Sequence, residues 1–347
     1  MKQDLPVKTF SIKRILIPLA ISFAVTFALI YFKGGEKGFM ETFLEIKWTN
    51  HVLFFFGISV IVHALRDIAY IWRIRVLANK ELSWKKCFEI VMLWETGSAV
   101  APSSAGGTGI AMFILNREGI NMGKSTAIIL HTLLLDKLYY VVIVPILLLI
   151  AGTLHVFPSE MPLLNSLENY LIITFSLMIL VTVLVYYGLF QNPALMKKWL
   201  VAIVFYFNFL KKFRKKIVKT GNDFILASKE LKAQPFRYHA EAFAATALSW
   251  SSRFMVLNFI LFALLPPFSH LLIYLRQVLA WLLMLLPTTP GASGVTEGTF
   301  SAILSDLGDV GVVTISIILW RFLTYYPYIL IGIFIFPKWL KRTANKN

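Results

Sequence analysis

The chain has 347 residues, of which 58% are hydrophobic, and its mean hydropathy is +0.71. A soluble globule of this composition would carry more apolar surface than it could bury, so the composition excludes an ordinary soluble domain and indicates an integral membrane protein. The formal net charge of +16 does not indicate nucleic acid binding, because the basic residues lie between apolar stretches. The single cysteine, Cys87, excludes an intrachain disulfide framework and a cysteine-rich metal site.

Six apolar windows approach or exceed the roughly 20 residues that a helix needs to cross a bilayer. The first window is not followed by a small-residue cleavage site, so we expect it to remain as a span rather than to act as a signal peptide. The sequence therefore predicts an all-α integral membrane protein with about six transmembrane helices, at 15–32, 52–76, 126–150, 170–190, 240–265 and 311–336.

The distribution of basic residues predicts the orientation. Lysines and arginines precede the first window, and the positive-inside bias places that end in the cytoplasm. Counting spans then places the basic stretch 191–239 and the C-terminal tail inside, and it places 151–169, which lacks Lys and Arg, outside. The sequence thus predicts a multi-pass protein of the cell membrane with both termini in the cytoplasm.

The basic stretch 191–239 contains one apolar segment, Trp199 to Leu210. This segment is too short to cross the membrane and lies between two lysine clusters, so we predict an interfacial helix within a cytoplasmic linker. The lysines would attract anionic lipid, or they would serve only to fix the topology.

Two further apolar stretches, about 88–115 and 271–305, are interrupted by glycine and proline. Pro102 to Ile110 matches Pro287 to Val295 at a shift of 185 residues, and the same shift carries the third window onto the sixth. The two copies are expected to begin on opposite sides of the membrane. The sequence therefore predicts two re-entrant helical hairpins in an inverted-topology repeat, about 52–150 and 240–336, within a single membrane domain of residues 1–347.

Each breakpoint is predicted to line a cavity, because non-helical backbone at membrane depth needs protein or water to satisfy its polar groups. A half-helix that begins there, capped by Ser or Thr and with Pro290 in its first turn, would direct N–H groups at an anion. The alternative is that the glycines only allow two helices to pack closely. The predicted binding residues at the breakpoints are Ser103, Ser104, Gly106, Gly107, Thr288, Thr289, Gly291, Ser293 and Gly294.

Ionisable residues in the middle of a span cost roughly 2.5–3.5 kcal/mol each on insertion scales, so we expect them to face a cavity or a partner. Asp136 and Arg321 occupy matching repeat positions, and mutual neutralisation is an alternative explanation for part of the set. Arg73 and Arg75, near a span end, are expected to snorkel. The predicted phosphate-binding cations are Arg66, Lys137, Arg253 and Arg321, and the predicted charge-balancing or proton-coupling groups are Asp67, Asp136 and Glu297.

The histidines of the spans do not predict a metal site. His63 and His131 are single histidines on apolar helices, and neither has a second histidine or cysteine at ligand spacing. A Ser-His-Asp set cannot be assembled from the sequence either. The sequence therefore predicts neither a cofactor nor a catalytic set, and we do not expect an enzyme.

Several motifs resemble one family. Phe113 to Ile120, Gly123 to Ala127, Asp136-Lys137 and Leu286 to Gly298 are similar to the lysylphosphatidylglycerol synthase transmembrane domain family, over about residues 10–340. The last motif looks like that family's Pro-Gly-Gly-x-Gly-x-x-Glu signature with Ala292 as the second glycine, whereas Thr108 stands where many relatives carry an acidic residue. The resemblance implies a flippase-like membrane domain that moves a phospholipid between leaflets. We expect no soluble synthetase domain, since the chain ends soon after the last span.

The expected function is translocation of an anionic phospholipid or a polyprenyl-phosphate-linked lipid between leaflets, with membrane lipids as partners and no nucleic acid. Two alternatives stay open. One is an enzyme that acts on a lipid-linked substrate and uses Asp136 or Glu297 as a base. The other is a non-transporting partner of a separate lipid- or glycan-synthesis enzyme, which would dock on 191–239.

Overall fold

The computed structural model describes residues 39–100, 104–151, 156–158, 164–206, 214–284 and 294–344, with residues 20, 24, 28, 31 and 292. All regular elements within these residues are helical. This confirms an all-helical membrane protein. Five helical stretches are long and apolar enough to span a bilayer: Asn50–Leu77, Met122–Ala151, Leu167–Gln191, Phe236–Leu264 and Val310–Thr343.

The first predicted span, at 15–32, cannot be compared in the same way. Only residues 20, 24, 28 and 31 of its neighbourhood are described, and they are helical. The other five predicted windows each coincide with one of the five long apolar stretches.

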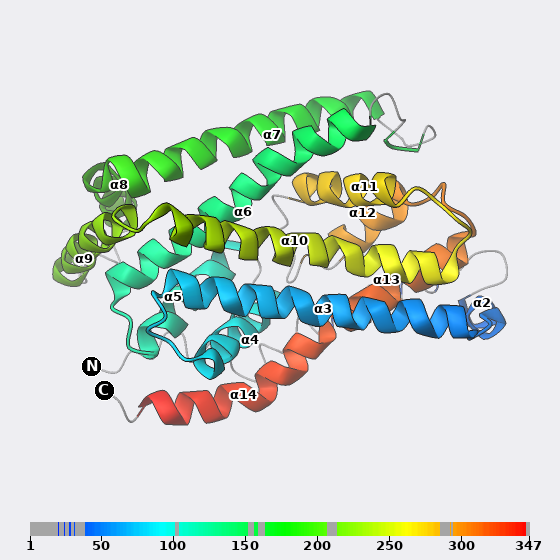
Figure 1. Cartoon of the computed structure of the whole chain (residues 1–347), viewed down its shortest axis with the longest axis horizontal. Helices are drawn as coiled ribbons and strands as arrows, with labels where there is room; N and C mark the ends of the chain where they lie inside the picture. The colour runs from blue at the N-terminus through cyan, green and yellow to red at the C-terminus, as the bar shows by residue number, and fades with distance from the viewer. Residues whose placement is uncertain are drawn as a thin grey trace.

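Figure 1 shows the arrangement of the helices. Their order along the chain is α2 (Phe39–Glu45), α3 (Asn50–Leu77), α4 (Trp84–Val100), α5 (Ser104–Arg117), α6 (Met122–Ala151), α7 (Leu164–Tyr186), the π-helix η2 (Tyr187–Gln191), α8 (Pro193–Tyr206), α9 (Arg214–Lys232), α10 (Phe236–Leu264), α11 (His270–Leu283), α12 (Val295–Ile303), α13 (Val310–Thr324) and α14 (Tyr326–Ala344).

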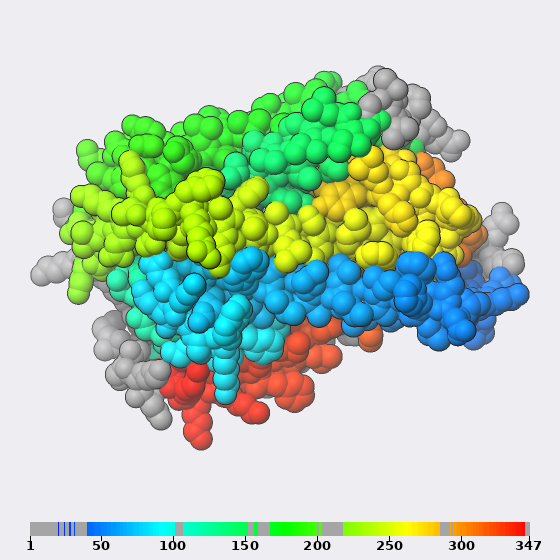
Figure 2. Space-filling view, in the orientation of Figure 1, coloured from blue at the N-terminus to red at the C-terminus, as the bar shows by residue number. Residues whose placement is uncertain are grey.

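Helices α3 and α10 run antiparallel side by side along the length of the molecule (Figures 1 and 2). His51 Nε2 lies 3.2 Å from the carbonyl of Phe262 at one end of the pair. The hydroxyl of Tyr238 donates to the carbonyl of Leu77 over 3.1 Å at the other end. These contacts join the first half of the chain to the second over the whole length of both helices.

The two broken apolar stretches are anchored at opposite ends of this pair. Lys124, at the start of α6, forms an ion pair with Glu81 in the turn between α3 and α4, so both ends of the α4–α5 unit lie beside the start of α6. At the far end, Arg276 of α11 binds both carboxylate oxygens of Asp306, which follows α12, at 2.5 and 2.7 Å. The α11–α12 unit therefore begins and ends at the end that carries α2 (Figure 1).

The last predicted span, 311–336, is two helices rather than one. Helix α13 ends at Thr324, Tyr325 leaves the helical conformation with φ −124° and ψ −56°, and α14 begins at Tyr326. Pro327 explains the interruption, because its ring would clash with the carbonyl of Leu323 in a continuous helix and it has no N–H to donate. After the break, α14 packs against α4 rather than α10.

The basic linker differs from the prediction. The predicted interfacial helix at Trp199–Leu210 overlaps α8, which begins earlier, at Pro193, and is described to Tyr206. Helix α9 then packs on α6, and a Cβ added to Gly123 would lie 2.4 Å from the backbone nitrogen of Phe224. With Phe224 and Leu231 buried, α9 is a packed part of the fold.

The buried apolar residues form two main clusters, one toward each end of the molecule. Along α6 the first cluster ends at Leu135 and the second begins at Tyr139, so Asp136 lies at the boundary. Arg66 of α3 lies at the same boundary. The fold thus gathers charged side chains where the two apolar clusters meet.

Candidate functional site

A cavity of about 330 Å³ opens at the boundary between the two apolar clusters. Its walls come from both halves of the chain, with contributions from α3 to α6 and from α10 to α14. The lining residues that carry charge or aromatic rings are His63, Arg66, Tyr70, Arg73, Trp94, Glu95, Asp136, Trp250, Arg253, Trp281, Trp320, Arg321, Tyr325 and Tyr328. Three of the predicted cations, Arg66, Arg253 and Arg321, are therefore brought together, and Lys137 is not among the lining residues.

Arg66 is the centre of a buried hydrogen-bond network. Its side chain is 2% exposed, and Nη1 donates to Asp67 Oδ1 and to the hydroxyl of Tyr328, each over 2.7 Å. Its Nη2 binds Glu95. Tyr328 in turn donates to Asp67 over 2.6 Å and lies 3.1 Å from His63 Nε2. A buried charge is tolerated only with such pairing, and these contacts neutralise the Arg66 guanidinium within the fold.

The repeat symmetry suggests a pair between Asp136 and Arg321, but the structure does not contain this pair. Asp136 binds the guanidinium of Arg73 and accepts a hydrogen bond from Trp250 Nε1 over 2.8 Å. The prediction that Arg73 snorkels is wrong, since Arg73 is buried and lines the cavity. The reason is geometric: Asp136 faces α3 and α10, and Thr246 of α10 adds a further contact to Arg73 at 3.4 Å.

Arg321 pairs instead with Glu297 of α12, from Nε to Oε1 over 2.7 Å. The other carboxylate oxygen of Glu297 accepts the N–H of Gly294 over 2.7 Å, which closes the first turn of α12. Gly294 is therefore the N-cap of α12, with φ +88°, a conformation that glycine adopts without strain. The prediction that a Ser or Thr caps this half-helix is wrong, because the N-cap of α12 is Gly294.

Arg253 is the most accessible of the cavity arginines. Its side chain is 25% exposed, against 8% or less for the other three, and its Nη2 lies 3.6 Å from Glu95 Oε1. The guanidinium carbon lies 5.0 Å from the ring centre of Trp250 and 5.4 Å from that of Trp281, so two indoles flank the cation. Arg253 is the cavity cation best placed to bind an anion.

The first breakpoint favours close packing at one glycine. A Cβ on Gly107 would lie 2.3 Å from Ser98 Oγ of α4, so this glycine allows α4 and α5 to approach. Gly106 lies in the first turn of α5, which begins at Ser104. Five predicted binding residues lie outside the described residues: Ser103, Thr288, Thr289, Gly291 and Ser293.

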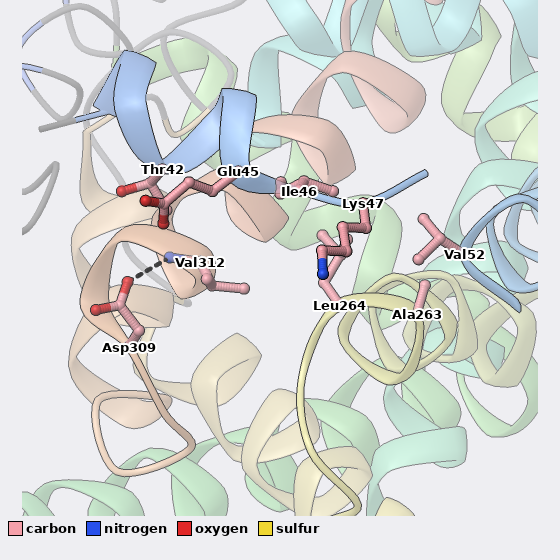
Figure 3. A pocket seen from close by; sticks show the side chains of 9 residues that line it. All are labelled: Thr42, Glu45, Ile46, Lys47, Val52, Ala263, Leu264, Asp309 and Val312. Carbon is pink, nitrogen blue, oxygen red and sulfur yellow. Dashed lines mark hydrogen bonds between the residues drawn. The ribbon is translucent and has the colours of Figure 1, made fainter. Parts of the chain in front are cut away.

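A second, larger cavity of about 450 Å³ lies at the end of the molecule that carries α2 (Figure 3). Thr42 and Glu45 of α2 line one side, and Lys47 lies near Leu264 at the end of α10. Asp309 caps α13 by accepting the N–H of Val312 over 3.1 Å. Several buried charged side chains converge on the cavity of about 330 Å³ described above, so we treat that cavity as the candidate site.

The sequence also matches known proteins. Residues 15–332 match the family described as the lysylphosphatidylglycerol synthase TM region. The chain belongs to this family. A UPF0104 membrane protein from Archaeoglobus fulgidus is 26% identical over 332 residues, which cover 91% of this chain and 94% of that protein.

In this member of the lysylphosphatidylglycerol synthase TM region family, the charged cavity is the candidate functional site. Within the described residues, His, Cys, Asp and Glu do not form a group of three or more that could hold a metal ion. Sequence reasoning missed the tyrosine and tryptophan partners of the cavity charges. One signal was present, since Trp250 and Arg253 are three residues apart and share one face of a helix.

Proposed function

We propose that this protein moves an anionic lipid, either a phospholipid or a polyprenyl-phosphate-linked lipid, between the leaflets of the cell membrane. The observation that carries the proposal is Arg253, a partly exposed cation between two indoles in a cavity that both halves of the chain line. A guanidinium binds phosphate oxygens in pairs and is more weakly hydrated than an ammonium group. The headgroup would enter the cavity, and the acyl chains would stay in the bilayer.

The cavity volume supports a headgroup rather than a whole lipid as the occupant. About 330 Å³ is near the lower end of the range for small-molecule sites, roughly 300–1,000 Å³. Two acyl chains would not fit in that volume. We therefore propose that the lipid is bound by its polar end only.

The helix order supports an inverted repeat with two re-entrant hairpins. At a shift of 185 residues, α4 (84–100) falls on α11 (270–283) and α5 (104–117) overlaps α12 (295–303). The two units are anchored at opposite ends of the α3–α10 pair. Broken helices in paired, oppositely oriented halves are typical of transporters whose site lies at the membrane midplane.

The cytoplasmic side is proposed to be the end that carries α9. Basic side chains gather there, on α9 and on the last turn of α14. The positive-inside bias would place this end in the cytoplasm, and it would place α2 and the α11–α12 connections outside.

The test is lipid movement by the purified full-length chain in vesicles. Fluorescent phosphatidylglycerol, phosphatidic acid, phosphatidylcholine and an undecaprenyl phosphate analogue would be placed in one leaflet, and their arrival in the other would be followed by chemical quenching. We expect movement of at least one anionic lipid. Arg253→Gln should slow it roughly tenfold or more, the size expected for loss of a hydrogen bond to a charged group.

The matched control is Arg237→Gln, an exposed arginine on the same helix, which should move lipid at the wild-type rate. Retention of every lipid in its starting leaflet would contradict the proposal. A covalently changed lipid, detected by mass spectrometry of the same vesicles, would favour an enzyme instead. If the isolated protein moved no lipid but bound a purified glycan-synthesis enzyme, the result would favour the role of an assembly partner.

A further inference from the structure

The charges at the cavity balance when no ligand is present. Four arginines line it, and four carboxylates either line it or bind those arginines directly, within the part of the chain that the structure describes. An anionic headgroup would leave this group with a net negative charge. In a region of low dielectric constant that imbalance is costly, so entry of the anion favours simultaneous uptake of a cation. The groups are Arg66, Arg73, Arg253 and Arg321, with Asp67, Glu95, Asp136 and Glu297.

Three of the four carboxylates have other roles that would be lost on protonation. Asp67 holds Arg66 and accepts from Tyr328. Asp136 holds Arg73 and Trp250. Glu297 holds Arg321 and closes the first turn of α12. Protonation of any of these would weaken a contact between helices or a helix terminus.

Glu95 is placed differently. It lines the cavity from α4, with a side chain that is 16% exposed, and its Oε1 is shared by Arg66 and Arg253. Arg66 keeps two further acceptors, Asp67 and Tyr328, if Glu95 becomes neutral. Arg253 has only the 3.6 Å contact to Glu95 among its carboxylate contacts in the described residues. The ion pair between Glu95 and Arg253 is therefore the one that a ligand can replace with least disturbance.

The ionisable groups around Glu95 come from three elements. Arg66 and Tyr70 interact with it from α3, Arg253 from α10 and Tyr328 from α14, and Asp67 shares Arg66 with it. In the empty cavity two guanidinium groups contact Glu95, those of Arg66 and Arg253. A phosphate at Arg253 would replace one of these contacts and add a negative charge beside Glu95, which favours binding of a proton there.

We infer that a lipid phosphate takes the place of Glu95 at Arg253 and that Glu95 then accepts one proton from solvent, so that each anionic headgroup binds together with one proton. The inference rests on the proposed function. It has a direct consequence for pH: binding consumes a proton, so affinity rises as pH falls, by at most roughly tenfold per pH unit.

The experiment is isothermal titration calorimetry of the full-length protein in detergent, with short-chain dioctanoyl phosphatidylglycerol as the probe. Titrations in two buffers with different ionisation enthalpies give the number of protons taken up per lipid bound. We expect the wild type to take up about one proton per lipid bound at one or more pH values between about 6 and 8. Glu95→Gln should bind the same lipid with no uptake.

The matched control is Glu89→Gln. Glu89 lies on the same helix with the same 16% exposure and also pairs with an arginine, Arg342, but it does not line the cavity. This variant should retain uptake of about one proton. Two results would overturn the role of Glu95 and leave the proposed function intact. One is lipid binding by the wild type without proton uptake across this pH range, and the other is uptake of a full proton by Glu95→Gln. Failure of the wild type to bind the lipid would overturn both the role of Glu95 and the proposed function.

Discussion

Trp250 of α10 donates a hydrogen bond from its indole Nε1 to Oδ1 of Asp136 on α6, over 2.8 Å. The contact joins the two halves of the chain at the cavity wall. Because Asp136 also binds Arg73 of α3, three helices meet at one carboxylate. The indole that Asp136 orients flanks Arg253, at 5.0 Å from the ring centre. Asp136 thus acts as a positioning residue for the cation that we propose binds phosphate.

Replacement of Asp136 by Asn is expected to destabilise the fold. It would leave the buried Arg73 without its carboxylate, and removal of one partner from a buried ion pair costs about 3–5 kcal/mol. The measurement is the apparent unfolding temperature in detergent. Glu81→Gln is the comparison, because Glu81 is 50% exposed in its pair with Lys124 and such pairs contribute about 0–1 kcal/mol. Equal stability of the two variants would contradict this role for Asp136.

The contact between α14 and α4 depends on a glycine. A Cβ on Gly332 would lie 2.3 Å from both Oγ1 and Cγ2 of Thr96. Thr96 cannot turn away freely, because its hydroxyl donates to the carbonyl of Tyr328 over 2.8 Å. Gly332→Ala is therefore expected to lower stability by about 1–3 kcal/mol, the usual cost of overpacking.

The control for this glycine is Gly57→Ala in α3, where no atom lies within 4 Å of the added Cβ. Alanine is a better helix former than glycine, so this variant should unfold at the same temperature as the wild type or higher. If Gly332→Ala also unfolds at the wild-type temperature, α14 does not pack on α4 as described.

Cysteine labelling tests the placement of the two broken units. Cys87 is fully buried, so the wild type should not react with a membrane-impermeant maleimide until it is denatured. Against that background, Glu81→Cys and Asn121→Cys should both be labelled only from the cytoplasmic side, and Pro267→Cys and Ser305→Cys only from the outside. These four positions are exposed. Labelling of Glu81→Cys and Ser305→Cys from the same side would refute the inverted arrangement.

Hydropathy predicted the five long apolar stretches that the structure describes, because crossing a bilayer demands long apolar runs that are visible in the sequence. It also predicted that Arg66, Arg253 and Arg321 face a cavity, because a charged side chain at membrane depth must face a cavity or pair with another charged group. The pairing of these charges was not predictable in the same way. Asp136 binds Arg73, 63 residues earlier in the chain. Sequence spacing gives the depth of a residue on its helix but not which neighbour that helix faces.

Local geometry accounts for the other differences. The helix break at Tyr325 follows from Pro327. This proline is visible in the sequence, but the surrounding residues are apolar throughout, so hydropathy alone predicted one continuous span. The packing of α9 on α6 depends on Gly123, where the missing side chain lets two backbones approach. A glycine of this kind cannot be distinguished in sequence from one that serves a turn, so α9 could not be placed.

Electron cryomicroscopy of the protein in nanodiscs of phosphatidylglycerol would test the claim that an anionic headgroup occupies the cavity between the two halves of the chain. We predict headgroup density inside the cavity, with its phosphate against the guanidinium of Arg253 and between Trp250 and Trp281. Lipid density confined to the outer surfaces of the spans, with the cavity closed by side chains in every particle class, would contradict the claim.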